Sequence, residues 1–180
     1  IVMDDGTTTR ISENHYHMTT TTAQAANVLS HLEYYLQLVW PELNVNVVST
    51  TEQWAGAAIA GPKSRDLLQK LFPNCNVSNE GLPFMGYIEG DLFGVKARIF
   101  RISFSGELAY EVNVESDNGN FMWENIIEVG QEFKIQHYGT EALSTLRIEM
   151  GHVAGSELDG RTIPYDNSLE SMVNKKKDFI

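Results

Sequence analysis

Basic residues, cysteines and long apolar runs are all scarce in this 180-residue sequence. There are 13 Lys and Arg residues against 24 Asp and Glu residues, a net charge of -11. We therefore do not expect a nucleic-acid partner, because binding to phosphates depends on a basic surface. No run of about 18 apolar residues occurs, so no membrane partner is expected. The start shows no signal-peptide pattern, and the single Cys75 excludes an intrachain disulfide. Together these features predict a cytoplasmic protein.

The common catalytic motifs are also missing. There is no phosphate-binding glycine loop and no dinucleotide-binding glycine fingerprint. His15 and His17 would share one face of a strand, but two histidines without a third ligand make a weak metal site, and we predict none. Cys75 lacks the local signatures of cysteine nucleophiles, so we interpret it as a loop residue.

The hydrophobic pattern predicts alternating strands and helices. Residues 7–11 and 15–22 indicate a strand pair, and apolar residues at helical spacing between Ala25 and Val39 indicate a helix that ends at Pro41. Alternation at 45–49 indicates a short strand, and the apolar run Trp54–Ala60 a buried one. Gly61 and Pro62 would begin the next helix.

The second half of the chain contains the clearest pattern. Residues 92–105 and 108–115 predict a hairpin around Ser105, Gly106 and Glu107. Two helices follow, and Gly151 would stop the last one. The fold class predicted is α+β, with antiparallel or mixed sheets, packed helices and a ferredoxin-like split βαβ arrangement in one half.

The acidic pair Asp4 and Asp5 is a first candidate site. In an extended segment the two side chains point to opposite faces, so only one of them would line a given pocket. Such a carboxylate could move a proton or stabilise a developing cation. The alternative is an ordinary turn that ends a strand, which the residues alone favour.

Glu111 is a second candidate, because it lies on the strand face opposite the apolar face of Tyr110, Val112 and Val114. A carboxylate there suits a pair of N–H donors on a flat heterocycle, and Phe104 could supply a stacking surface. The alternatives are a solvated glutamate and a core phenylalanine.

Three stretches resemble the glycine-cleavage T-protein family. The first, residues 1–32, contains the apolar-Asp-Asp phrase, a strand pair and a helix. The second, 97–114 (ARIFRISFSGELAYEVNV), is similar to the family's arginine-to-glutamate hairpin. The third, 138–173, resembles its Leu-Arg-Leu-Glu helix and Thr-Pro loop, and its opening YGTEAL resembles sarcosine oxidase alpha subunits. Dimethylglycine dehydrogenases remain an alternative.

The resemblance implies roles for individual residues. Asp5 falls on the family's catalytic carboxylate and Glu111 on the glutamate that holds the pterin ring of folate. Phe104 replaces a family tyrosine, so stacking is retained without the hydroxyl. Asp4 and Thr21 fall near the folate, the latter by a weaker match. Leu143 replaces a family arginine, which removes a basic contact.

The resemblance also implies a domain plan. Residues 1–83 would be part of the folate-binding domain, 84–173 a second α+β folate-binding subdomain, and 174–180 the start of a linker to a further domain. The family's opening region and C-terminal domain are not matched, so we expect a fragment that is inactive alone.

The activity implied is that of the folate-binding, aminomethyltransferase-like part of a sarcosine oxidase. It would capture the imine from sarcosine on tetrahydrofolate, as 5,10-methylene-tetrahydrofolate. Flavin (FAD or FMN) and NAD would bind other regions or subunits of a hetero-oligomeric enzyme. The alternatives are a T-protein-like or dimethylglycine dehydrogenase-like aminomethyltransferase, and a non-enzymatic folate-binding or subunit-docking module.

Overall fold

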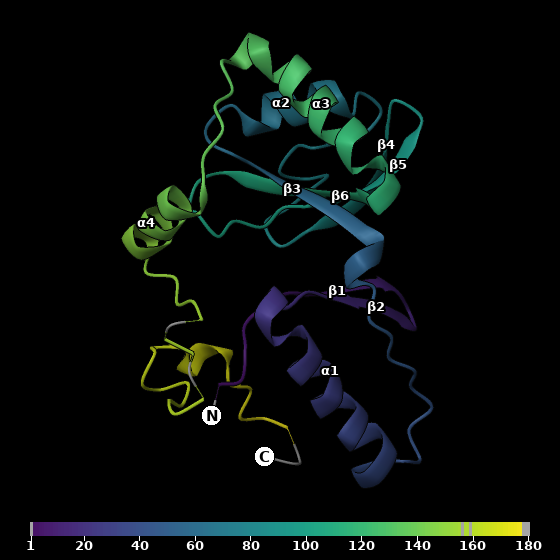
Figure 1. Cartoon of the computed structure of the whole chain (residues 1–180), viewed down its shortest axis with the longest axis vertical. Helices are drawn as coiled ribbons and strands as arrows, with labels where there is room; N and C mark the ends of the chain where they lie inside the picture. Colours follow the sequence, from purple (N-terminus) through teal and green to yellow (C-terminus); the bar gives the residue numbers. More distant parts are fainter. Residues whose placement is uncertain (1, 156, 159, 178–180) are drawn as a thin grey trace. The chain divides into compact units, whose positions relative to one another are not determined.

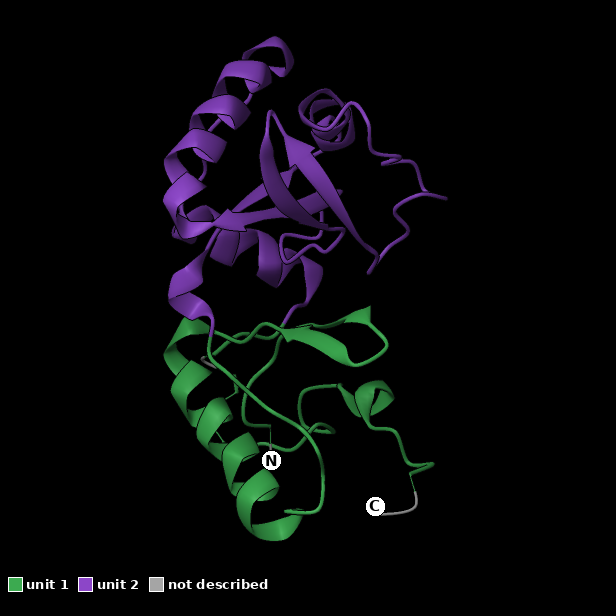
Figure 2. Ribbon diagram, turned by 90° about the vertical axis from the view of Figure 1, so that its right-hand side faces the viewer, with its two compact units in different colours: residues 1–49, 153–180 green, residues 50–152 purple. Residues whose placement is uncertain are grey.

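The chain forms two compact units (Figure 2) in a computed structural model that describes residues 2–155, 157, 158 and 160–177. Unit 1 contains Ile1–Ser49 and Val153–Ile180, and unit 2 contains Thr50–His152. The domain boundary predicted between residues 83 and 84 falls inside unit 2. The compact units divide elsewhere because strands from both sides of that boundary pair in one sheet.

Unit 1 contains the predicted strand pair and helix. Strands β1 (Thr8–Ser12) and β2 (His15–Met18) pair antiparallel. Helix α1 (Ala25–Tyr34) continues as a π-helical turn, η2 (Tyr35–Val39), and ends just before Pro41. The strand predicted at 45–49 is wrong: the segment has no partner strand, and the Val45 N–H donates to the Leu43 carbonyl at 2.9 Å.

Unit 1 buries little of its apolar surface. Among its described residues only Leu158 is fully buried, and α1 has no buried residue. Leu38 and Val48 are 71% and 76% exposed. The hydrophobic contribution to stability is therefore concentrated in unit 2.

Unit 2 is a four-stranded antiparallel sheet covered on one face by helices (Figure 1). The strand order is β3 (Trp54–Ala60), β6 (Ala109–Glu115), β5 (Val95–Phe100) and β4 (Tyr87–Leu92). Helices α2 (Ser64–Leu71) and α3 (Gly119–Gly130) pack together on this sheet. The predicted α+β class is confirmed.

The split βαβ arrangement predicted for one half is not found in unit 2. Strands β3 and β4, which flank α2 in the chain, lie at opposite edges of the sheet, and every neighbouring pair is antiparallel. A split βαβ unit needs two parallel strands on either side of a single strand. The long apolar run of β3 predicts a buried strand, but it does not show whether the neighbouring strands are parallel, as in a split βαβ unit, or antiparallel.

The core of unit 2 lies between the sheet and the two helices. One face of each strand points into it, as the period of two requires. The fully buried side chains include a tyrosine, a phenylalanine and several aliphatic residues: Phe72, Leu68, Leu71, Leu82, Leu92, Ile99, Tyr110, Val112 and Val114. The opposite face of the sheet is therefore left for other contacts.

The predicted hairpin is wider than expected. Residues 101–108 separate β5 from β6, so Ser105–Glu107 is part of a longer loop. The tight turn lies instead between β4 and β5 at Phe93 and Gly94, whose φ angles are 51° and 97°. Two consecutive positive φ angles give the turn twist that matches antiparallel strands. The sequence prediction missed this turn because Phe93 is not a typical residue for it.

The helix ends are close to those predicted. Helix α2 begins at Ser64, so Pro62 precedes the helix. The Ser64 Oγ donates to the Leu108 carbonyl at 2.8 Å. Helix α4 (Thr140–Met150) ends at Gly151, which has φ 80°, as predicted. Among the residues that the structure describes, no helix is both long and apolar enough to cross a membrane.

Candidate functional site

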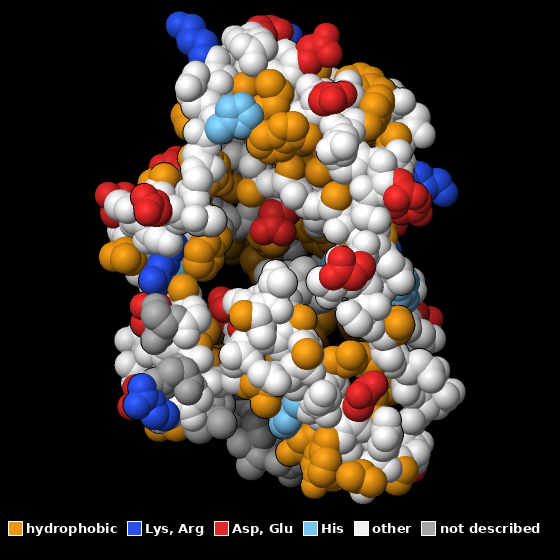
Figure 3. Space-filling view, in the orientation of Figure 1, with side chains coloured by type: hydrophobic (Ala, Val, Ile, Leu, Met, Phe, Trp, Pro, Cys, Tyr) orange, Lys and Arg blue, Asp and Glu red, His pale blue; other side chains and the backbone are white. Residues whose placement is uncertain are grey.

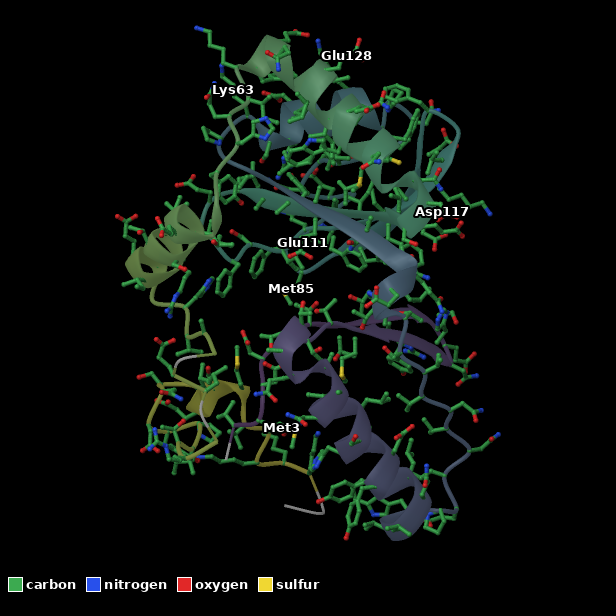
Figure 4. All side chains as sticks on the ribbon, in the orientation of Figure 1. Met3, Lys63, Met85, Glu111, Asp117 and Glu128 are labelled. Carbon is green, nitrogen blue, oxygen red and sulfur yellow. The ribbon has the colours of Figure 1, made fainter. Side chains whose placement is uncertain are left out.

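Strand β6 presents two different faces. Tyr110, Val112 and Val114 are fully buried in the core, whereas Glu111 and Asn113 are half-buried on the opposite face. Figure 4 shows Glu111 on the side of the sheet away from Glu128 of α3. The predicted position of Glu111 on the second face is thus confirmed.

The neighbours of Glu111 on this face are small on one side and aromatic on the other. In the register, Glu111 lies between Ala58 of β3 and Phe100 of β5. Phe100 is only 3% exposed, and its ring centroid is 5.1 Å from that of Tyr87. The carboxylate is therefore next to a small side chain, Ala58, on the β3 side and next to aromatic side chains on the β5 side.

The environment of Glu111 disfavours its charge. Burial raises the pKa of the Glu111 carboxyl above its ordinary value. The pKa of Tyr138 is also raised, first by burial and then by the charge of Glu111, which places the phenol near the carboxylate. No hydrogen bond to the Glu111 carboxylate is found among the described residues. A ligand that supplies N–H donors would compensate this burial.

Phe104 lies in the loop between β5 and β6. It is 38% exposed and stacks on His152, with ring centroids 5.8 Å apart and planes at 29°. The His152 Nδ1 atom lies 2.9 Å from the Phe104 carbonyl oxygen, which fixes this arrangement. Phe104 is thus available as a flat surface, and its role toward folate stays a prediction.

Asp4 and Thr21 form a local hydrogen-bonded pair in unit 1. The Thr21 N–H donates to Asp4 Oδ2 at 2.9 Å and its hydroxyl donates to Oδ1 at 3.0 Å. Gly6 permits the segments to approach, since a Cβ there would lie 1.9 Å from the Thr19 carbonyl oxygen. Asp4 therefore stabilises the segment, while the neighbouring Asp5 is exposed.

The predicted site residues fall in both units. Glu111 and Phe104 belong to unit 2, whereas Asp4, Asp5 and Thr21 belong to unit 1. That Asp5 and Glu111 face one cavity stays a prediction. Leu143, where the resemblance predicts a family arginine, is half-buried in α4.

Two neighbours of Glu111 were not singled out from the sequence. Tyr138 lies in the phrase that resembles sarcosine oxidases, but nothing in the pattern placed it near Glu111. Asn113 shares the strand face of Glu111, so the period of two was a signal for it. No group of three or more metal-binding side chains occurs within the described part of the chain.

The chain also matches a known protein family. Residues 1–177 match the family model described as the GCVT N-terminal domain. The chain belongs to this family. The GCVT N-terminal domain thus accounts for nearly the whole sequence, including both units.

Among its relatives, this GCVT domain is most usefully compared with three proteins. It is 47% identical to sarcosine oxidase subunit alpha of Rhizobium meliloti over 99% of the chain and 18% of the relative. The same protein of Corynebacterium sp. strain P-1 is 47% identical over 100% and 19%. An aminomethyltransferase of Chloroherpeton thalassium is 29% identical over 99% and 48%. The chain thus spans less than a fifth of the length of these sarcosine oxidase subunits.

Proposed function

We propose that this domain is the folate-binding, aminomethyltransferase-like portion of a sarcosine oxidase alpha subunit. It captures the imine formed by oxidative demethylation of sarcosine onto tetrahydrofolate, giving 5,10-methylene-tetrahydrofolate. The half-buried carboxylate of Glu111 is the observation that carries this proposal. The 47% identity to sarcosine oxidase alpha subunits over the whole chain supports the choice of substrate.

The chemistry around Glu111 fits a reduced pterin. A carboxylate with a pKa raised by burial gains from two N–H donors, and the ring edge of tetrahydrofolate offers an amino group beside a ring N–H. Ala58 leaves room above the sheet, while Phe104 offers a surface for stacking. We propose that Glu111 orients the ring and that Phe104 supports it.

Asp5 is proposed as the catalytic carboxylate. Tetrahydrofolate supplies the amine that takes up the one-carbon unit. The Asp5 carboxylate would accept a proton from that amine, and its negative charge would favour the cationic imine. Asp4 and Thr21, proposed as folate contacts, would also hold Asp5 in position through their two hydrogen bonds.

Other parts of the enzyme would perform the oxidation. A flavin, FAD or FMN, and NAD are proposed in other regions or subunits of a hetero-oligomeric, cytoplasmic sarcosine oxidase. The acidic surface in Figure 3, where red side chains are more widespread than blue ones, fits the net charge of -11. Because the oxidation is proposed to take place elsewhere in the enzyme, the isolated domain is expected to be inactive.

A second candidate is an aminomethyltransferase domain of another enzyme, such as dimethylglycine dehydrogenase. The mouse mitochondrial dimethylglycine dehydrogenase is 33% identical over 76% of this chain and 16% of its own length. A module that binds folate or docks to subunits without catalysis is a third. The position of Leu143, where the resemblance places an arginine, favours a folate site that differs from that of T-proteins.

The experiment that tests the proposal uses the complete protein that carries this domain. Asp5→Asn is expected to lower the yield of methylene-tetrahydrofolate while sarcosine still reduces the flavin at the normal rate. Glu13→Gln, an exposed acidic residue in the β1–β2 turn, serves as the matched control. Equal loss of both activities in Asp5→Asn would contradict the role. Folate binding without any turnover would favour the non-enzymatic module.

A further inference from the structure

Asn113 lies two residues beyond Glu111 on the same face of β6. Alternate residues of a strand are about 7 Å apart, so both head groups can reach one ligand. Of the residues on this strand face, Ala109, Glu111, Asn113 and Glu115, only Asn113 has a side-chain N–H donor. No hydrogen bond to its amide is found among the described residues. Its donor is therefore available to a ligand.

Gly56 leaves the space that the Asn113 amide occupies. It lies opposite Asn113 on β3, and a Cβ at Gly56 would meet Asn113 Oδ1 at 2.4 Å and Cγ at 3.6 Å. No third atom lies within 4 Å, so the Nδ2 group is turned away from Gly56. Glycine inside a strand usually marks such a close approach. In the structure the amide oxygen therefore faces β3 and the NH2 group points away from it.

Arg98 lies on the other side of Asn113, opposite it on β5. Its guanidinium stacks over the Trp54 ring, 3.9 Å from the centroid. Arg98 also interacts with the Tyr87 hydroxyl, so its cation has partners on both sides of the face. The Asn113 amide is a neutral donor on the same strand face as the carboxylate of Glu111.

We infer that Asn113 is a specificity-determining contact for the ring that binds at Glu111, an inference that rests on the proposed folate function. The recognition edge of a reduced pterin carries two N–H donors followed by a carbonyl oxygen at position 4. Glu111 accepts from the two donors, and the Asn113 NH2 group donates to the oxygen. A 4-amino ring presents a donor at that position, and two donors facing each other are unfavourable. The same ring has no hydrogen on N3, so Glu111 also contributes to the preference, and the share of Asn113 is the part that changes in Asn113 variants.

The test compares two ligands on the complete protein that contains the domain. Calorimetry gives Kd for tetrahydrofolate and for its 4-amino-4-deoxy analogue, and the ratio measures the preference. Asn113→Leu is expected to reduce the wild-type preference for the 4-oxo ligand by roughly tenfold, the effect of one hydrogen bond. Asn113→Asp, which is nearly isosteric, should reduce the preference further than Asn113→Leu, because its carboxylate accepts from the 4-amino group and repels the 4-oxo oxygen.

Gly56→Ala gives an independent route to the same result. The added methyl group displaces the Asn113 amide, so the preference should fall as it does in Asn113→Leu. The double variant should show no further loss, because both changes remove one contact. Glu115→Gln, an exposed position on the same strand face, is the control and should leave the ratio unchanged.

The outcomes separate this inference from the proposed function. If the wild type binds neither ligand, both are wrong. If it binds tetrahydrofolate but the ratio is unchanged in Asn113→Leu and Asn113→Asp, the inference alone is wrong. An equal loss of affinity for both ligands would likewise contradict it, because that result indicates a packing role. Should Asn113→Leu fail to fold, the ratio for Asn113→Asp decides.

Discussion

Both carboxylate oxygens of Asp4 accept hydrogen bonds from Thr21, one from its N–H at 2.9 Å and one from its hydroxyl at 3.0 Å. This pair joins the segment before β1 to the segment before α1. It gives the first acidic residue of the pair a structural task and leaves Asp5 exposed beside it.

Thr21→Val removes one of these two bonds. We expect unit 1 to lose about 1 kcal/mol of stability, because a part-buried acceptor loses its hydroxyl donor. Urea unfolding, monitored by hydrogen exchange of the β1 and β2 amides, measures this loss. Thr22→Val, an exposed neighbour, is the control. A similar loss in both variants would show that the Asp4–Thr21 bond contributes nothing specific.

Glu111→Gln should stabilise the ligand-free protein at neutral pH. Because burial raises the pKa of Glu111, the stability that its protonated form gives is present at low pH and is lost as pH rises through the raised pKa. The neutral glutamine avoids this loss. Thermal melting should therefore show a higher Tm for the variant at pH 7, and no difference below the ordinary glutamate pKa of about 4.3.

The comparison for this pH profile is Glu115→Gln, which changes an exposed carboxylate on the same strand. Its Tm should follow that of the wild type throughout the pH range. A Glu111→Gln variant that is less stable than the wild type at pH 7 would contradict the unfavourable burial of this charge.

Tyr110→Phe should leave unit 2 as stable as before or make it more stable by about 1 kcal/mol. The Tyr110 hydroxyl is fully buried and has no hydrogen-bond partner among the described residues, so its removal relieves a desolvation cost. Denaturant unfolding measures the change. A loss of more than about 1 kcal/mol would mean that the hydroxyl is well bonded in the folded protein.

The two units should differ in their amide hydrogen exchange in the isolated chain. Of the buried side chains in the described part of the chain, nearly all lie in unit 2, whereas α1 has none. We expect amides of β6 to be protected far longer than those of α1, since few buried contacts oppose local opening. Mass spectrometry of peptic peptides checks this. Equal protection of α1 and β6 would be inconsistent with the observed burial.

The sequence was most informative where a strong local pattern met a simple constraint. The alternation in β6 placed Tyr110 in the core and Glu111 on the opposite face, and Gly151 marked the end of α4. The pattern also predicted the β1–β2 pair. Each of these depends on neighbours in the chain, which a sequence shows directly.

The errors arose where the structure depends on distant partners. Residues 45–49 have the alternation of a strand, but a strand exists only when another strand pairs with it. The turn at Phe93–Gly94 depends on the register of β4 and β5. The place of Tyr138 near Glu111 and the contact of Gly56 with Asn113 likewise require the folded arrangement.

The central claim is that Glu111 holds the ring of tetrahydrofolate. Calorimetric titration of tetrahydrofolate into the complete protein, its Glu111→Gln variant and its Glu115→Gln variant tests this most directly. Loss of a charge-assisted pair of bonds, about 1.5–3 kcal/mol, predicts that Glu111→Gln weakens binding by roughly 10- to 100-fold, with Glu115→Gln unchanged. Equal affinity in all three proteins would contradict the claim.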